Sequence, residues 1–145
     1  MLKVNTASRG FTLIELMIAL AVFTILAGLA IPAYINYSIR SKVDAALSLG
    51  AGAKIAVTFS CQEDPALINL TNQNTGYQFT ETKYVFNIVI GGTCLAPTIT
   101  ITTQATGARP DPVLTITGDF TPGTKTTWTC VSSGLVIHAP KTCRS

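Results

Sequence analysis

A long uncharged stretch near the N-terminus places the strongest constraint on this chain. No charged side chain occurs between Glu15 and Arg40, and most residues between them are apolar. A helix needs about 20 apolar residues to cross the hydrocarbon core of a bilayer, so this stretch is long enough to span a membrane. The sequence therefore predicts a transmembrane helix over residues 11–39, followed by a globular head over residues 40–145.

Glu15 lies just inside the upstream edge of this apolar stretch. A carboxylate in lipid costs at least about 2.5 kcal/mol and usually has a function, so we expect Glu15 to have a partner. Cleavage of the chain after Gly10 would supply one, because it would place a cationic amino group on Phe11, one helical turn from Glu15. Within one chain this pair would help to neutralise the carboxylate. Between staggered chains it would align one helix with the next.

Two other interpretations of the same residues are open. Thr12 and Glu15 have the spacing of a capping box, in which each side chain bonds a free amide of the other residue at the start of a helix. The stretch could also be a secretory signal, with basic Lys3 and Arg9, an apolar region and a cut near Ala27 to Ala30. A signal peptide would leave a soluble secreted domain. The apolar stretch is long for a signal peptide, and it contains Glu15.

The run GFTLIEL at residues 10–16, after a basic leader and before an apolar helix, resembles the processing and assembly signature of the type IV pilins. The resemblance implies that residues 1–10 are a leader that is removed on maturation. It also implies that a prepilin peptidase cuts between Gly10 and Phe11 and N-methylates Phe11. Glu15 would then align subunits as they enter the filament.

Helical periodicity continues beyond the apolar stretch. Small and apolar residues recur at spacings of three and four as far as Val57, which predicts one helix from about Thr12 to about Phe59. Pro32 removes a backbone hydrogen bond and predicts a kink. Gly28 lies four residues before Pro32. In pilins the helix between a glycine and a proline at such positions can melt during assembly, so the resemblance implies that the segment from Gly28 to Pro32 makes the filament extensible. A proline tolerated in a transmembrane helix is the alternative.

Basic residues and cysteines predict the orientation. Lys3 and Arg9 favour a cytoplasmic N-terminus, although Arg40 and Lys42 on the other side weaken this signal. All four cysteines follow residue 60, and disulfides persist in the periplasm or outside the cell. We expect a precursor in the inner membrane with a periplasmic head. By the pilin resemblance, the mature form lies in an extracellular pilus.

The second half of the chain carries strand signals. After a polar connecting loop over residues 60–82, with a short helical turn at Pro65–Leu70, alternating runs separated by Gly and Pro turns predict an antiparallel sheet over residues 83–130. The expected strands are 83–90, 98–103, 113–117 and 126–130, with turns at Gly91-Gly92 and Pro122-Gly123. The predicted fold class is α+β, a long N-terminal helix packed on a roughly four-stranded antiparallel sheet, with the threonines on the solvated face.

Four cysteines allow three pairings. We favour Cys61 with Cys94, joining the polar loop to the sheet, and Cys130 with Cys143, closing a C-terminal loop over residues 130–143. The run from Trp128 to Cys130 and the last six residues also resemble type IVa pilins. Their disulfide loop is exposed on the fibre and can contact host receptors or surfaces. The candidate contact residues here are Cys130, His138, Pro140, Lys141 and Cys143.

A loop that only holds the chain end is the alternative to a receptor-contact loop. The Cys61–Cys94 pair is less typical of the family's two-cysteine members. Ser145, at the exposed end, could be glycosylated, as in some relatives.

No catalytic, metal or cofactor site is evident in the sequence. His138 is the only histidine and is expected at the surface, and the cysteines lack the C-x₂-C spacing of a zinc site. Neither a phosphate-binding loop nor a nucleophile elbow occurs. Beyond Ser60 the head has five basic and five acidic side chains, so binding to DNA would be weak at most for each subunit. We expect no enzymatic activity, no cofactor and no metal.

The resemblance implies a major structural subunit that polymerises through its N-terminal helix into a retractable surface filament for adhesion and twitching motility. The expected partners are other copies of the chain, the prepilin peptidase, the inner membrane with the pilus assembly machinery, and a host-cell receptor or surface. A minor pilin or a type II secretion pseudopilin is one alternative. A subunit of a DNA-uptake pilus is another, in which Lys125, Lys141 and Arg144 would contact phosphate.

Overall fold

The computed structural model describes residues 10–121 and 125–144. Lys3 and Arg9 of the expected leader, the expected turn at Pro122-Gly123, and Ser145 lie outside the described residues. The chain divides into two units, Met1–Ile35 and Asn36–Ser145. One helix, α1, continues from the first unit into the second.

Helix α1 spans Leu13–Glu63, four residues further than the periodicity predicts. At its start the Glu15 amide donates a 3.3 Å hydrogen bond to the Thr12 hydroxyl oxygen, which is one half of the predicted capping box. The helix continues through Pro32 without a break in its assignment. It is long and apolar enough to cross a membrane, and the most apolar part has no buried residue.

In the second unit α1 presents a buried stripe to the sheet. The stripe members recur at spacings of three and four, as expected for one face of a helix. They are Ile39, Val43, Ala46, Gly50, Ala53, Val57, Ser60 and Cys61. The absence of a side chain at Gly50 lets β2 pack close to the helix, because a Cβ atom there would lie 2.6 Å from the Cδ1 atom of Ile101.

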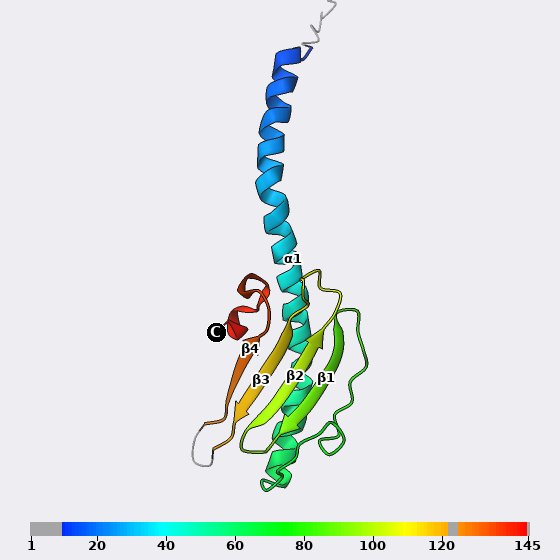
Figure 1. Ribbon diagram of the computed structural model, residues 1–145, viewed down its shortest axis with the longest axis vertical. Coiled ribbons are helices and arrows are strands. Elements are labelled where there is room, and N and C mark those ends of the chain that lie inside the picture. The colour runs from blue at the N-terminus through cyan, green and yellow to red at the C-terminus, as the bar shows by residue number, and fades with distance from the viewer. Residues whose placement is uncertain (1–9, 122–124, 145) are drawn as a thin grey trace, which may run out of the picture. The chain divides into compact units, whose positions relative to one another are not determined.

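The sheet is an antiparallel meander in the order β1-β2-β3-β4 (Figure 1). Its strands are β1 (Val85–Gly92), β2 (Pro97–Thr103), β3 (Val113–Asp119) and β4 (Thr127–Ser132). Ile99 pairs with Ile116, and both side chains are fully buried. The alternate threonines Thr98, Thr100 and Thr102 are half-buried on the other face. The predicted α+β class, with one long helix on four antiparallel strands, is confirmed.

Two local predictions were wrong. Gly91 and Gly92 belong to β1, and the connection to β2 is formed by residues 93–96. Gly92 has φ +84°, and a Cβ atom there would collide with the carbonyl oxygen of Ala96, so a glycine is needed beside the turn. Residues 65 and 66 form a single turn and residues 67–70 have no regular secondary structure, where the sequence predicted a short helical turn over residues 65–70.

The loop after α1 covers the outer edge of β1. The Asn72 side chain donates to the Ile88 carbonyl oxygen at 2.8 Å and accepts from the Ile90 amide at 2.7 Å. The Leu70 amide also donates to the Gly92 carbonyl oxygen at 2.9 Å. These contacts satisfy backbone groups that an edge strand would otherwise expose to another chain.

Candidate functional site

The predicted processing residues lie at the start of the helical segment. Gly10 and Phe11 precede α1 and are not helical, and the Phe11 side chain is 84% exposed. Glu15 is exposed in the first turn of α1. Gly28 and Pro32 both lie within α1, and a Cβ atom at Gly28 would meet nothing within 4 Å. Both residues of the predicted cleavage site are therefore exposed and lie outside the helix.

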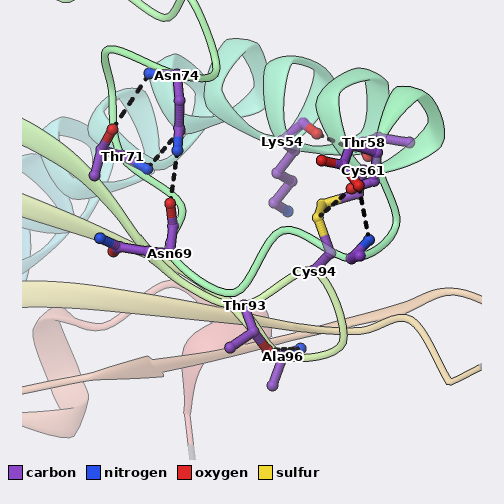
Figure 2. The surroundings of a disulfide bond; sticks show 11 residues. Lys54, Thr58, Cys61, Asn69, Thr71, Asn74, Thr93, Cys94 and Ala96 are labelled. Carbon is purple, nitrogen blue, oxygen red and sulfur yellow. Dashed lines mark hydrogen bonds between the residues drawn. A yellow bond between two sulfur atoms is a disulfide. The ribbon is translucent and has the colours of Figure 1, made fainter.

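The structure pairs Cys61 with Cys94, with 5.4 Å between their Cα atoms (Figure 2). Cys61 belongs to the last turns of α1, so the bond joins the helix to the β1–β2 connection. The sequence had placed Cys61 in the polar loop. Nearby, Asn74 holds that loop in shape, because its amide group donates to the Asn69 carbonyl oxygen at 2.6 Å and accepts from the Thr71 amide at 2.7 Å.

The second disulfide joins Cys130 in β4 to Cys143, with 4.5 Å between the Cα atoms. Cys143 ends the short 3-10 helix η2 (Lys141–Cys143), and another such helix, η1 (Val136–His138), lies within the closed loop. The predicted Cys130–Cys143 loop is therefore confirmed. We call residues 133–144, which follow β4, the C-terminal loop.

The C-terminal loop folds against α1 in the second unit. The His138 imidazole Nε2 lies 3.1 Å from the Asn36 Oδ1 atom. The Arg40 guanidinium donates two hydrogen bonds to the Ile137 carbonyl oxygen, at 3.1 Å and 2.7 Å. His138 is only 7% exposed, so the prediction that it is a surface residue was wrong. Its partner is far away in the sequence, and no local pattern could have indicated this contact.

The candidate contact residues therefore differ in accessibility. Lys141 is exposed, Cys130 is half-buried, and His138, Pro140 and Cys143 are buried. The exposed apolar side chains of the loop are Leu135, Val136 and Ile137, which are 47–60% exposed. Sequence reasoning overlooked them, although three consecutive apolar residues in a loop were a visible signal. A partner would meet these three side chains together with Lys141.

An apolar groove lies between the end of α1 and the start of β4. It has a volume of about 360 Å³ and is lined by Lys54, Ile55, Thr58, Phe59, Gln62 and Trp128. The Lys54 ammonium lies 5.6 Å from the centre of the Trp128 ring, a cation–π distance. The Phe120 ring packs edge-on against the Trp128 ring, with 5.4 Å between the ring centroids. No local sequence pattern indicates this groove, because it combines one face of a helix with a strand that is distant in the chain.

Among the described residues, no group of three or more His, Cys, Asp or Glu side chains could hold a metal ion. All four cysteines are in disulfides. These features define a disulfide-bonded α+β protein with an exposed apolar N-terminal helix.

Two family models match this chain. The model described as the prokaryotic N-terminal methylation motif matches residues 5–31, and the model described as pilin, a bacterial filament protein, matches residues 39–144. The chain belongs to the type IV pilin family. Pilins are structural proteins that assemble into filaments, so this chain is a pilus subunit. The methylation motif and the apolar helix support a membrane-anchored precursor.

Individual relatives support this assignment. The chain is 34% identical over 141 residues to the fimbrial protein EcpC of Eikenella corrodens, a match that covers 94% of this chain and 91% of the relative. It is 54% identical over 54 residues to the type IV major pilin protein PilE1 of Neisseria gonorrhoeae, covering 37% of this chain and 33% of that protein. A fimbrial protein of Dichelobacter nodosus is 40% identical over 80 residues, which is 50% of each chain.

Proposed function

We propose that this chain is the major subunit of a retractable type IV pilus used for adhesion and twitching motility. The observation that carries the proposal is the match to EcpC along 94% of this chain, which includes both the anchor and the head. The shorter match to PilE1, which is named a major pilin, supports the choice of a major subunit. No catalytic role is part of the proposal.

Maturation would begin at the chain's N-terminal end. A prepilin peptidase would cut between Gly10 and Phe11 and methylate the new amino group. The exposed, non-helical backbone at these two residues supports this step, because a peptidase needs an extended and accessible segment. The precursor would lie in the inner membrane with its N-terminus in the cytoplasm and its head in the periplasm, where disulfides persist.

Assembly would depend on Glu15. Glu15 follows Phe11 by four residues and is exposed, so its carboxylate is available to the cationic N-terminus of its own chain or of a neighbour. Partial loss of helix between Gly28 and Pro32 would allow the assembled fibre to lengthen, since the proline already lacks one backbone hydrogen bond. The pilus assembly machinery of the inner membrane would supply subunits to the fibre.

Contact with a host receptor or surface would involve the C-terminal loop. Its exposed side chains are Lys141 and the apolar residues 135–137, and these would form the contact. DNA binding would be weak for each subunit, because the part of the head beyond Ser60 has as many acidic as basic side chains.

The test is N-terminal sequencing and intact-mass measurement of fibres sheared from cells that express the chain. We expect abundant fibres whose subunit begins at methylated Phe11 and contains two disulfides. Scarce material with the same N-terminus would favour a minor pilin or pseudopilin. A start near residue 30 in a soluble protein would instead indicate an ordinary signal peptide and would contradict the proposal.

A further inference from the structure

The groove beside Trp128 exposes large apolar side chains that a solitary head would leave in water. Ile55 is 71% exposed and Phe59 is 61% exposed, and they lie one turn apart on α1. Together with Trp128 they form most of the groove's apolar lining. Exposed apolar patches of this kind mark surfaces that bind another molecule.

Two acidic residues directly follow Gln62, the last groove-lining residue of α1. Glu63 ends α1, and Asp64 follows it; both are exposed. A helix C-terminus carries partial negative charge and is stabilised by cations, yet the last turn of α1, all of it within the described residues, has no basic side chain. Two carboxylates therefore lie at the negative end of the helix dipole, where negative charge is unfavourable. A cation supplied by another molecule would be stabilising here.

The C-terminal loop has the complementary properties. Leu135, Val136 and Ile137 expose apolar side chains, and Lys141 and Arg144 are exposed nearby in the chain. No acidic residue occurs in the loop sequence. The disulfide and the two Arg40 hydrogen bonds to the Ile137 carbonyl hold the loop in shape before any binding, which reduces the entropic cost of docking.

One copy of the chain cannot make this contact with itself. The loop is attached to α1 at Arg40, and the groove is lined by α1 residues around Thr58. At 1.5 Å per residue these positions lie about 27 Å apart along the helix. A loop that is fixed at one end of the head does not reach a groove at the other end. A second copy can bring the two surfaces together.

We propose that the C-terminal loop of one subunit docks into the groove of another copy of this chain. Leu135, Val136 and Ile137 cover Ile55, Phe59 and Trp128, while Lys141 and Arg144 approach Glu63 and Asp64. Because the two surfaces differ, the contact is heterologous, and repetition of such a contact builds an open helical fibre unless the rotation closes a ring. The inference rests on the filament assembly described under Proposed function and names a contact between heads within the filament. In a fibre with this contact, the C-terminal loop stays uncovered, and so open to a receptor, only in subunits at one end of the fibre.

Photo-cross-linking of the full chain in sheared filaments tests this contact. Val136 is replaced by benzoyl-phenylalanine, and the irradiated filaments are reduced and digested with trypsin. Since trypsin cuts after Lys54 and Lys83, the expected cross-linked partner is the peptide of residues 55–83, with the link located by fragmentation within residues 55–62. The same replacement at Val89, an exposed residue of β1, is the control and should not label residues 55–62.

Charge reversal provides a second measurement. Glu63→Lys and Lys141→Glu alter exposed side chains, so each head should fold with both disulfides. Each single change should lower the filament yield about tenfold, and the double variant should recover most of the yield. Cross-links from position 136 that map elsewhere, or a double variant no better than the singles, would overturn the contact. Absence of filaments from the unaltered chain would instead contradict the proposed function.

Discussion

The Nε2 atom of His138 lies 3.1 Å from the Oδ1 atom of Asn36, although 102 residues separate them in the chain. An amide oxygen only accepts hydrogen bonds, so the imidazole donates through Nε2. The other ring nitrogen, Nδ1, is buried and has no hydrogen-bond partner among the described residues. Together with the Arg40 hydrogen bonds to the Ile137 carbonyl oxygen, this side-chain contact connects the C-terminal loop to the first residues of α1 in the second unit.

Replacement of Asn36 should therefore destabilise the head. Asn36→Ala leaves the buried imidazole without its acceptor, which costs about 1–3 kcal/mol. Thermal unfolding of the full chain in detergent measures this loss. In a double-mutant cycle, His138→Ala should remove most of the effect of Asn36→Ala, because the two residues share one interaction. Additive losses would mean that the contact does not couple them.

Gly50 belongs to the buried face of α1 that packs on the sheet, so its replacement tests this packing. A Cβ atom there would lie 2.6 Å from the Ile101 Cδ1 atom and 3.4 Å from the Ile116 Cδ1 atom, both in fully buried side chains. Gly50→Ala should lower the free energy of unfolding by about 1–3 kcal/mol through overpacking. Melting temperatures measure the change.

Gly52→Ala is the matched control for Gly50→Ala. Its Cβ atom would meet only the Tyr77 ring, at 3.4 Å, so the better helix propensity of alanine should leave the stability unchanged or raise it by up to about 1 kcal/mol. Equal effects at both positions would show that helix propensity decides the outcome and would contradict the overpacking argument.

The parts of the fold that could be predicted are those encoded by local periodicity. The stripe through Val43 and Val57 follows the 3.6-residue period of a helix, and the Thr/Ile alternation of residues 98–103 follows the two-residue period of a strand. The Asn72 contacts with β1 and the burial of His138 leave no such pattern. They depend on single side chains that reach backbone or amide groups far away in the sequence. The groove beside Trp128 could not be predicted either, because it is formed by residues of α1 and β4 that are distant in the sequence.

Asp119 gives the β3–β4 connection a dependence on pH. Its carboxylate accepts hydrogen bonds from the Thr121 hydroxyl at 2.6 Å and from the Thr121 amide at 3.1 Å. These bonds lower the pKa of Asp119 below its usual value of 3.8. A carboxyl group whose pKa is lower in the folded state stabilises that state above its unfolded pKa, and this contribution disappears as the pH falls through the folded pKa.

We therefore expect faster exchange of the Thr121 amide in Asp119→Asn than in the unaltered chain at neutral pH. The difference should shrink below about pH 4, as the unaltered carboxylate is protonated. Hydrogen exchange measured over a pH series, after correction for intrinsic rates, gives the comparison. A difference that stays constant from pH 7 to pH 2 would contradict the role of the charged carboxylate.

The Cys130–Cys143 disulfide should stabilise the head and keep the C-terminal loop in shape. It closes a separation of 13 residues, so removal of both cysteines in Cys130→Ser/Cys143→Ser should cost about 3 kcal/mol in the loop-entropy model. Urea unfolding of the full chain measures the loss, and fewer surface fibres should accompany it.

Removal of the Cys61–Cys94 pair, whose separation is 33, provides the comparison and should cost somewhat more. An unchanged unfolding midpoint in the first variant would show that contacts such as Arg40 with Ile137 are sufficient to hold the loop.

Glu15→Gln separates the two roles that the N-terminal sequence allows for this residue. The capping hydrogen bond runs from the Glu15 backbone amide to the Thr12 hydroxyl, so glutamine retains it and can also replace glutamate in the capping box. The negative charge is lost, and with it the pairing to the cationic N-terminus. The variant should enter the membrane and reach normal levels, yet build few fibres.

Membrane fractionation and quantification of sheared fibres distinguish the two roles. The control is Thr12→Val, a variant that loses the cap but keeps the charge. Normal fibre numbers in Glu15→Gln together with a defect in Thr12→Val would leave capping as the function of this end of the helix.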